Sequence, residues 1–344
     1  MVALADVLAS NAAVKTALPP AAAADSALVG VFVGATSGIG RTSLLHLARH
    51  TARPRLYFVG RSQRAADEML RTLLREANPD GEYRFVRADV SLLREVDRTD
   101  EKLTLILALS YYSRMRFIAN LLPQLRRAPA LRRVVSVMAG TKEGPLDPRD
   151  IPGRHVRPWR ARGHLCTMTT LTLEDFARQA PAVSFVHSYP GFVDTPLAGS
   201  MRGVVGALMR AVFFVTGLVR PHSYIEECGE RHVYLATGAR FPPRTAAPGT
   251  TTTAAAAAAA DDGDGDGDVG VKELAQGSAV EATAAAPAPA LGTDGVAGSG
   301  VYSVDELCEP ADAAVRAFLQ AQRDAGLGRA IAEHLQQVFT RVSQ

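Results

Sequence analysis

The residues best placed to do chemistry form a glycine-rich turn, Gly-Ala-Thr-Ser-Gly-Ile-Gly, at positions 34–40. An apolar β-branched run precedes this turn, and a helical pattern of leucines follows it. Glycines permit a tight turn and a close approach of a pyrophosphate, while the start of a helix offers free N–H groups and the positive end of its dipole. The pattern therefore predicts a dinucleotide-phosphate site at Gly34, Ser37, Gly38, Ile39 and Gly40. A glycine-rich turn without a ligand is the alternative.

The end of the second predicted strand carries the residues that select the cofactor. Arg61 lies 21 residues past Gly40 and is followed by Ser62. An acidic residue there would bind the ribose of NAD, whereas a guanidinium and a hydroxyl suit the 2′-phosphate of NADP. We therefore expect NADP(H), against the alternative of a solvated arginine. Asp89 closes the third predicted strand, where we expect it to accept from the adenine amine or to cap a helix.

Motifs at these places carry a resemblance to a known family: GATSGIG at 34–40, VGRS at 59–62, ADVS at 88–91 and YPGFVDTP at 189–196. With them the chain resembles the short-chain dehydrogenase/reductase family. A narrower likeness, to a divergent branch found in fungal secondary metabolism, rests on ASNAAVK at 9–15, SYYSRMRF at 110–117, RGHL at 162–165 and GSGVYS at 298–303. The resemblance implies a seven-stranded Rossmann sheet with NADP at the carboxyl ends of its strands. It also implies that the nicotinamide carboxamide and a cofactor phosphate meet Pro190, Gly191, Val193 and Thr195.

The catalytic residues that the resemblance implies are substituted. That family uses a tyrosine as proton donor, a lysine four residues on, a serine and an asparagine. Free tyrosine has a pKa of about 10 and needs a nearby cation to exchange protons near neutrality. None of the eight tyrosines of this chain has a lysine four residues on. The family tyrosine and lysine fall on Arg162 and Cys166, the serine on Ala139, and the asparagine near Ser110.

Other side chains are candidates for the missing proton transfer. His164 shares the predicted helix of Arg162, and an imidazole titrates near neutrality. Tyr112 forms a Tyr-x-x-x-Arg pair with Arg116. His164 and Tyr112 are therefore the predicted catalytic residues, each against a plainer interpretation: an exposed or partly packed histidine for His164, and an i,i+4 pair on a helix face for Tyr112. Tyr189, which precedes the Pro-Gly turn, is interpreted as a core aromatic at the end of a strand.

The elements that must position these residues alternate between strand and helix, which predicts βαβ units. The expected fold class is α/β: a Rossmann-like doubly wound parallel sheet, in a single domain with a disordered low-complexity insertion. Predicted strands cover 28–33, 55–59, 83–90, 133–138, 183–189 and 300–304. Predicted helices follow the glycine turn and cover 65–77, 111–127, 162–178, 224–236, 312–322 and 329–342.

The fourth strand of the sheet is harder to place. Only 21 residues separate Asp89 from Ser110, about half of what a helix, a strand and their loops need. In the interpretation we prefer, 91–102 is a short helix and 103–109 (LTLILAL) is the fourth strand. In the other, 100–127 is one helix and a hole remains beside the first strand. A gene model that dropped an exon would produce the same sequence.

Composition divides the 344 residues into unequal parts. Residues 1–27 are an Ala-rich lead-in, and 28–242 form the NADP-binding Rossmann domain, with 32 basic against 21 acidic residues in 1–242. Residues 243–299 are predicted to be a disordered insertion, because they contain too few apolar groups to fold. Residues 300–344 are expected to complete the fold. Residues 262–273 match the calcium-loop pattern, but a Gly-Asp repeat readily produces such a match by chance, so no metal site is expected.

Several partners and compartments are disfavoured. Three cysteines without paired spacing suit a reducing compartment, and no secretory signal is evident, so a cytoplasmic protein is expected. The apolar stretch 203–219 is short and has Arg210 at its centre, which argues against a membrane span. The arginines are spread through many elements, so nucleic acid is not an expected partner.

Two function classes remain. The first is an NADP(H)-dependent oxidoreductase that reduces a carbonyl of a secondary metabolite, a small molecule of the polyketide or terpenoid kind; a homo-oligomer stays open. The second is a catalytically degenerate NADP-binding protein that acts as a scaffold or regulator, and the substituted Ser-Tyr-Lys-Asn positions favour it. The resemblance and the intact turn at Pro190 favour the first.

Overall fold

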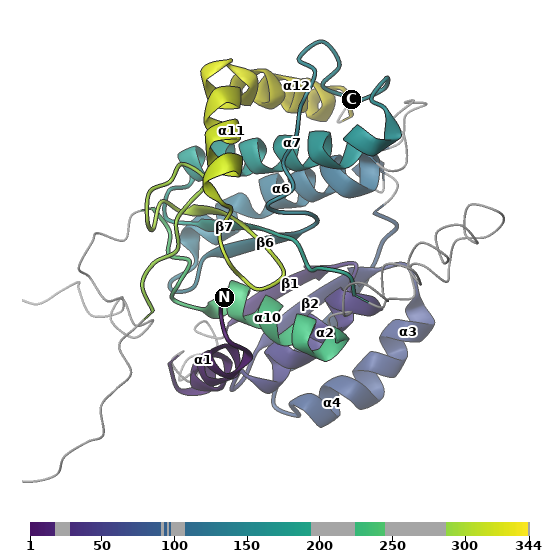
Figure 1. Ribbon diagram of the computed structural model, residues 1–344. Helices are drawn as coiled ribbons and strands as arrows, with labels where there is room; N and C mark the ends of the chain where they lie inside the picture. Colours follow the sequence, from purple (N-terminus) through teal and green to yellow (C-terminus); the bar gives the residue numbers. More distant parts are fainter. Residues whose placement is uncertain are drawn as a thin grey trace, which may run out of the picture.

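The computed structural model describes residues 1–17, 28–90, 93–94, 96–97, 107–193, 224–244 and 287–342 (Figure 1). Within these ranges parallel strands alternate with helices, which confirms the predicted α/β fold of Rossmann type. No helix in the described ranges is both long and apolar enough to cross a membrane. The apolar stretch 203–219 lies outside them.

Three strands of the N-terminal half form one parallel sheet in the order β1-β2-β3. They are β1 (Val29–Val33), β2 (Arg55–Gly60) and β3 (Glu82–Arg87). The connecting helices are α2 (Gly38–Arg49) and a longer helix made of α3 (Gln63–Glu68), the π-helical turn η2 (Met69–Leu73) and α4 (Leu74–Ala77). Leu56 and Phe58 of β2 are fully buried against these helices. The predicted elements are confirmed, except that the third strand ends at Arg87 rather than at residue 90.

A second parallel sheet, ordered β6-β7-β8, comprises β6 (Arg133–Val137), β7 (Ser184–Ser188) and β8 (Val301–Val304). Helices cover both of its faces (Figure 1). One face carries η3 (Ala108–Tyr112), α6 (Ser113–Arg127), α7 (Pro158–Gln179), α11 (Ala313–Asp324) and α12 (Leu327–Val342); the other carries α1 (Leu4–Ala17) and α10 (Ile225–Thr237). Neighbouring residues of β7 show this plainly, because Phe185 packs with the α7 side and Val186 with the α10 side.

The preferred position of the fourth strand is not supported. Residues 107–112, which include the end of the predicted strand, are helical, and Leu107, Ala108, Tyr111 and Tyr112 are buried. Their spacing repeats every three to four residues, so a helix turns all four toward α7, whereas a strand would divide them between two faces. The described part of the predicted helix 91–102 consists of two short parallel strands, β4 (Leu93–Arg94) and β5 (Val96–Asp97).

The implied seven-stranded sheet is therefore two three-stranded sheets in the part of the chain that the structure describes. No described strand pairs with the free edge of β1. Val29, Val31 and Val33, which share one face of β1, are 41–55% exposed. Residues 98–106, on which the two interpretations differ, lie outside the described residues.

The structure also describes parts of the predicted lead-in and insertion. Residues 4–17 form α1, which packs on α10. Residues 287–299, placed in the insertion, belong to the packed fold: Ala290 and Thr293 are buried, and Leu291 bridges to Ala297. The rest of the insertion, 245–286, lies outside the described residues, together with the calcium-loop match.

Candidate functional site

The glycine turn lies between β1 and the N-terminus of α2. Gly34 and Gly38 adopt φ of 79° and 57°, values that favour glycine, and a carbon added at Gly34 would meet no atom within 4 Å. Gly40 is required for another reason, since a Cβ there would lie 2.8 Å from the Gly34 carbonyl oxygen. Ser37 is the N-cap of α2 and makes no side-chain cap hydrogen bond. The turn thus offers open space in front of a helix N-terminus, which fits a phosphate.

The end of β2 lies beside this turn. The Val59 carbonyl accepts from the Gly34 N–H at 2.9 Å, and Gly60 packs directly against the Thr36 side chain. Arg61 follows with a side chain 74% exposed, and its Nη1 lies 4.0 Å from an Asp89 carboxylate oxygen. The structure therefore brings Arg61 and Asp89 together next to the glycine turn.

Ser62 has a structural role that the sequence did not suggest. Its hydroxyl oxygen accepts a hydrogen bond from the Ala65 N–H at 3.2 Å and so caps the N-terminus of α3. The hydroxyl proton can still be donated to a ligand, because capping uses only an oxygen lone pair.

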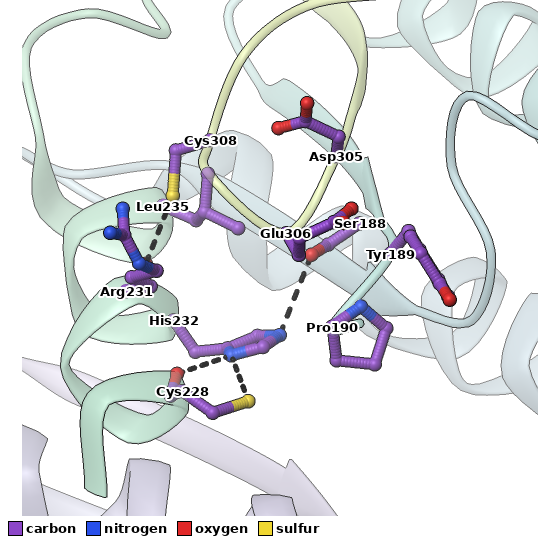
Figure 2. Close-up of a pocket in the computed structure, with 10 residues that line it drawn as sticks. All are labelled: Ser188, Tyr189, Pro190, Cys228, Arg231, His232, Leu235, Asp305, Glu306 and Cys308. Carbon is purple, nitrogen blue, oxygen red and sulfur yellow. Dashed lines mark hydrogen bonds between the residues drawn. The ribbon is translucent and has the colours of Figure 1, made fainter. Parts of the chain in front are cut away.

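The turn expected to meet the nicotinamide follows β7. Pro190 comes directly after Tyr189, and Gly191 adopts a φ of 77°. Val193 forms a β-bridge, and Thr195 lies outside the described residues. Pro190 also borders a cavity of about 10 Å³ between α10 and the loop at 305–308 (Figure 2). That cavity has room for one water at most, so it is not the cofactor cleft.

Neither predicted catalytic residue has surroundings that support that role. His164 is buried, and its Nε2 lies 2.9 Å from the Ile151 carbonyl oxygen. Tyr112 is fully buried, with its hydroxyl 2.6 Å from Nε2 of His334 on α12. These partners hold both side chains in the packing around α7 and α12, which Figure 1 places on the opposite side of the second sheet from α2. Both side chains are more deeply buried than their plainer interpretations expected, and Tyr112 pairs with His334 rather than standing on a helix surface.

Two of the substituted family positions meet in space. Ala139, after β6, and Cys166, on α7, are both buried and form one hydrophobic cluster with Tyr189. The pKa of the Cys166 thiol is raised to about 12, first by burial and then by the charge of Glu143, so this thiol is inert near neutrality. Tyr189 thus shares a buried cluster with both positions at which the family carries serine and lysine.

A cation lies beside the Tyr189 ring, and sequence analysis missed it. Lys142 Nζ is 5.2 Å from the centroid of the Tyr189 ring. Lys142 follows the position of the family serine by three residues, and it is one of only four lysines in the chain. That scarcity and the place after β6 were the available signals. Searching for a lysine four residues after a tyrosine could not find this pair, because the two residues come from different strand ends.

A buried polar network holds the loop that carries Lys142. The Ala139 N–H donates to Nε2 of His187 at 3.3 Å, so Nδ1 carries the proton and donates to the Thr170 hydroxyl at 2.8 Å. Thr170 in turn donates to Oε1 of Glu143 at 2.7 Å. Complete burial lowers the pKa of His187 to about 3, and burial raises that of Glu143. The His187 ring is therefore neutral near pH 7, although it lies only 3.7 Å from the Glu143 carboxyl.

Backbone contacts fix the same loop. A Cβ at Gly140 would lie 2.2 Å from the His187 carbonyl oxygen. Thr141 has a φ of 64°, which a β-branched residue rarely adopts, and its N–H donates to the Ser303 hydroxyl at 2.7 Å. Loop 139–143 is thus bound to the ends of β7 and β8, and Lys142 has a defined place.

Sheet order, glycine turn and strand-end residues together define a Rossmann-type α/β protein. An oxidoreductase of Emericella nidulans is 36% identical over 276 residues, which cover 71% of this chain and 79% of that protein. An NmrA-like family domain-containing oxidoreductase of an Aspergillus species is 36% identical over 63% of this chain and 72% of its own length. A short-chain dehydrogenase/reductase of Stachybotrys chartarum is 28% identical over 62% and 73%. This chain belongs to the short-chain dehydrogenase/reductase family of oxidoreductases, in its fungal branch, as its motifs predicted.

Other comparisons add little. No family model matches the chain. Among solved structures, L-sorbose reductase from Gluconobacter frateurii overlaps 61% of this chain and 90% of its own, at 17% identity. Its TM-score of 0.46 is too low to support an argument about the site.

Proposed function

We propose that this oxidoreductase uses NADP(H) to reduce a carbonyl group of a secondary metabolite. The observation that carries the proposal is the open glycine turn at the N-terminus of α2, with the exposed guanidinium of Arg61 beside it. The turn would hold the pyrophosphate through backbone N–H groups, and Arg61 would hold the 2′-phosphate. The substrate class, a polyketide or terpenoid carbonyl, rests on the family resemblance. Three buried, unpaired cysteines favour the cytoplasm.

Bound NADPH would supply a hydride to the carbonyl carbon, and the chain must then supply a proton to the carbonyl oxygen. Tyr189 is the residue we assign to this step in place of His164 and Tyr112. Its hydroxyl would donate the proton, and the ammonium of Lys142 over its ring would stabilise the phenolate that remains until solvent returns the proton. Pro190 and Gly191 directly follow Tyr189, so the same turn would position donor and nicotinamide.

The test of cofactor choice is a titration of wild-type protein and Arg61→Ala with NADPH and NADH, followed by nucleotide fluorescence. A guanidinium–phosphate hydrogen bond contributes about 1.5–3 kcal/mol. Because Arg61 is 74% exposed, we expect the lower end, about a tenfold loss of NADPH affinity. NADH affinity should not change. Arg71→Ala, which removes another exposed arginine, is the matched control. Equal affinity of the wild-type protein for both nucleotides, or none, would refute the proposal.

The binding-protein alternative has one observation in its favour: Ala139 and Cys166 offer no hydroxyl or cation at the family positions. Oxidation of NADPH with a panel of aromatic ketones, followed at 340 nm, separates the two functions. Turnover supports the oxidoreductase. Tight NADPH binding with oxidation at background would favour the scaffold or regulator.

A further inference from the structure

A cluster of histidine and glutamate side chains joins α2 to α10, outside the site described above. His46 and His50 lie one turn apart on α2, and they face Glu226 and Glu230, one turn apart on α10. His46 Nδ1 is 2.7 Å from Oε1 of Glu230, and His50 Nε2 is 2.9 Å from Oε2 of the same carboxylate. One nitrogen of each ring and a Glu230 oxygen all lie within 4.8 Å of one another.

His46 has a carboxylate near each nitrogen of its ring. Its Nε2 lies 2.8 Å from Oε2 of Glu226. Its Nδ1 is buried and makes no hydrogen bond, although Oε1 of Glu230 is 2.7 Å away. An imidazole nitrogen and a carboxylate oxygen, both of which can bind a metal ion, thus face each other inside the cluster.

We propose that His46, His50 and Glu230 bind a divalent transition-metal ion, with Zn²⁺ as the best match. Two imidazoles and one carboxylate are a ligand set that Zn²⁺ uses in proteins, and a fourth position would be left for water. Ligand atoms around a tetrahedral Zn²⁺ lie roughly 3.4 Å apart, given bonds of about 2.1 Å. The two nitrogen–oxygen separations, 2.7 and 2.9 Å, would need to open by less than about 1 Å to reach this value.

The surroundings also fit a metal centre. A histidine ligand commonly donates its other N–H to a carboxylate, which fixes its ring, and Glu226 accepts from His46 in this way. Glu230 is fixed by Asn11 of α1, whose Nδ2 donates to Oε2 at 2.7 Å. The rings and the Glu230 side chain are at most 20% exposed, so water competes little for the ligand atoms.

The backbone permits the close approach that the site needs. A Cβ at Gly229 would lie 2.6 Å from the His46 ring and 2.6 Å from the Thr42 side chain, so only glycine allows α10 to lie this close to α2. The ion would fasten α1, α2 and α10 at one point. Since α2 begins at the glycine turn, the ion would also stabilise the helix proposed to receive the pyrophosphate. The metal site itself does not depend on that proposed function.

The test uses the full chain, freed of metal with a chelator and dialysed. Co²⁺ titration should give one equivalent of visible d–d absorption in the range of four-coordinate sites, and Zn²⁺ should abolish it. Zn²⁺ should also raise the melting temperature. Both His50→Gln and Glu230→Gln should weaken the metal affinity at least about a hundredfold, and Glu226→Gln about tenfold. His155→Gln, at a largely exposed histidine of a distant loop, is the matched control and should bind as the wild-type protein does.

The outcomes separate a metal site from an ordinary ion-pair network. Wild-type protein without Co²⁺ absorption and without a Zn²⁺-dependent shift in melting temperature would overturn the proposal. Equal metal affinity in His50→Gln and His155→Gln would overturn it as well, because binding would then be adventitious. Should the Glu230→Gln variant fail to fold, the wild-type titration and the His50→Gln variant still decide.

Discussion

The buried imidazole of His187 makes the stability of the fold depend on pH in a calculable way. Burial lowers its pKa from 6.5 to about 3, with a further contribution from the charge of Arg114. Below pH 6.5 the imidazole binds a proton in the unfolded chain but not in the native state. The contribution of His187 to the free energy of unfolding is therefore complete above pH 6.5 and is lost as pH falls toward 3. The slope is about 1.4 kcal/mol per pH unit. Between pH 7 and pH 5 the loss is about 2 kcal/mol.

A comparison with His187→Asn isolates this contribution from that of other titrating groups. The asparagine amide can still donate to Thr170, but the Ala139 N–H loses its acceptor, which costs about 1–3 kcal/mol at every pH. Urea unfolding at pH 7 and pH 5, followed by circular dichroism, measures both proteins. We expect the wild-type advantage seen at pH 7 to shrink by about 2 kcal/mol at pH 5. A constant difference would mean that the native state protonates His187 as readily as the unfolded chain does, and the neutral imidazole described here would be incorrect.

Two further perturbations test the candidate site. Tyr189→Phe and Lys142→Met should each lower kcat for ketone reduction about a hundredfold while NADPH affinity stays within about twofold; unchanged kcat in both would return Tyr189 to a core role. Gly40→Ala should lower the melting temperature and NADPH affinity together, because its Cβ would lie 2.8 Å from the Gly34 carbonyl oxygen. Gly328→Ala, on α12 with no atom within 4 Å of its Cβ, should change neither or stabilise slightly, by less than about 1 kcal/mol, and a Gly40→Ala variant that behaves the same way would contradict the packing argument.

Local pattern was sufficient for most of the elements and for the position of the glycine turn. The glycine turn needs only a short strand, a helix start and particular φ values, all of which lie within a dozen consecutive residues. Arg61 was predictable for the same reason, since it follows the next strand directly. The end of the predicted fourth strand, residues 107–109, is helical, because an apolar run such as LTLILAL does not by itself distinguish a buried strand from a buried helix. The buried residues Leu107, Tyr111 and Tyr112 have the spacing of a helix, which agrees with the helical conformation of residues 107–112.

The proton-donor pair and the histidine–glutamate cluster were beyond local pattern for a different reason. Lys142 and Tyr189 are 47 residues apart, and His46 and Glu226 are 180 apart, so only the packing of strands and helices reveals that they meet. The His-x-x-x-His spacing in α2 was visible, but alone it describes one helix face. Its partner face on α10 becomes evident only once α2 and α10 are known to pack together.

Loop 139–143 distinguishes a site without catalytic groups from a site in which other residues replace those of the family. A protein that only binds nucleotide has no need of an ordered lysine at this place. Yet Thr141 keeps a φ of 64°, and Glu143 stays buried with a raised pKa, and each feature opposes folding. Strain of this kind persists where the surrounding structure enforces it, and here His187, Thr170 and the β8 end do so. The strained loop holds the Lys142 ammonium over the Tyr189 ring, next to Ala139 and Cys166, which lack the hydroxyl and the cation of the family. A lysine held where the family's own polar groups are absent is the strongest structural reason to expect turnover.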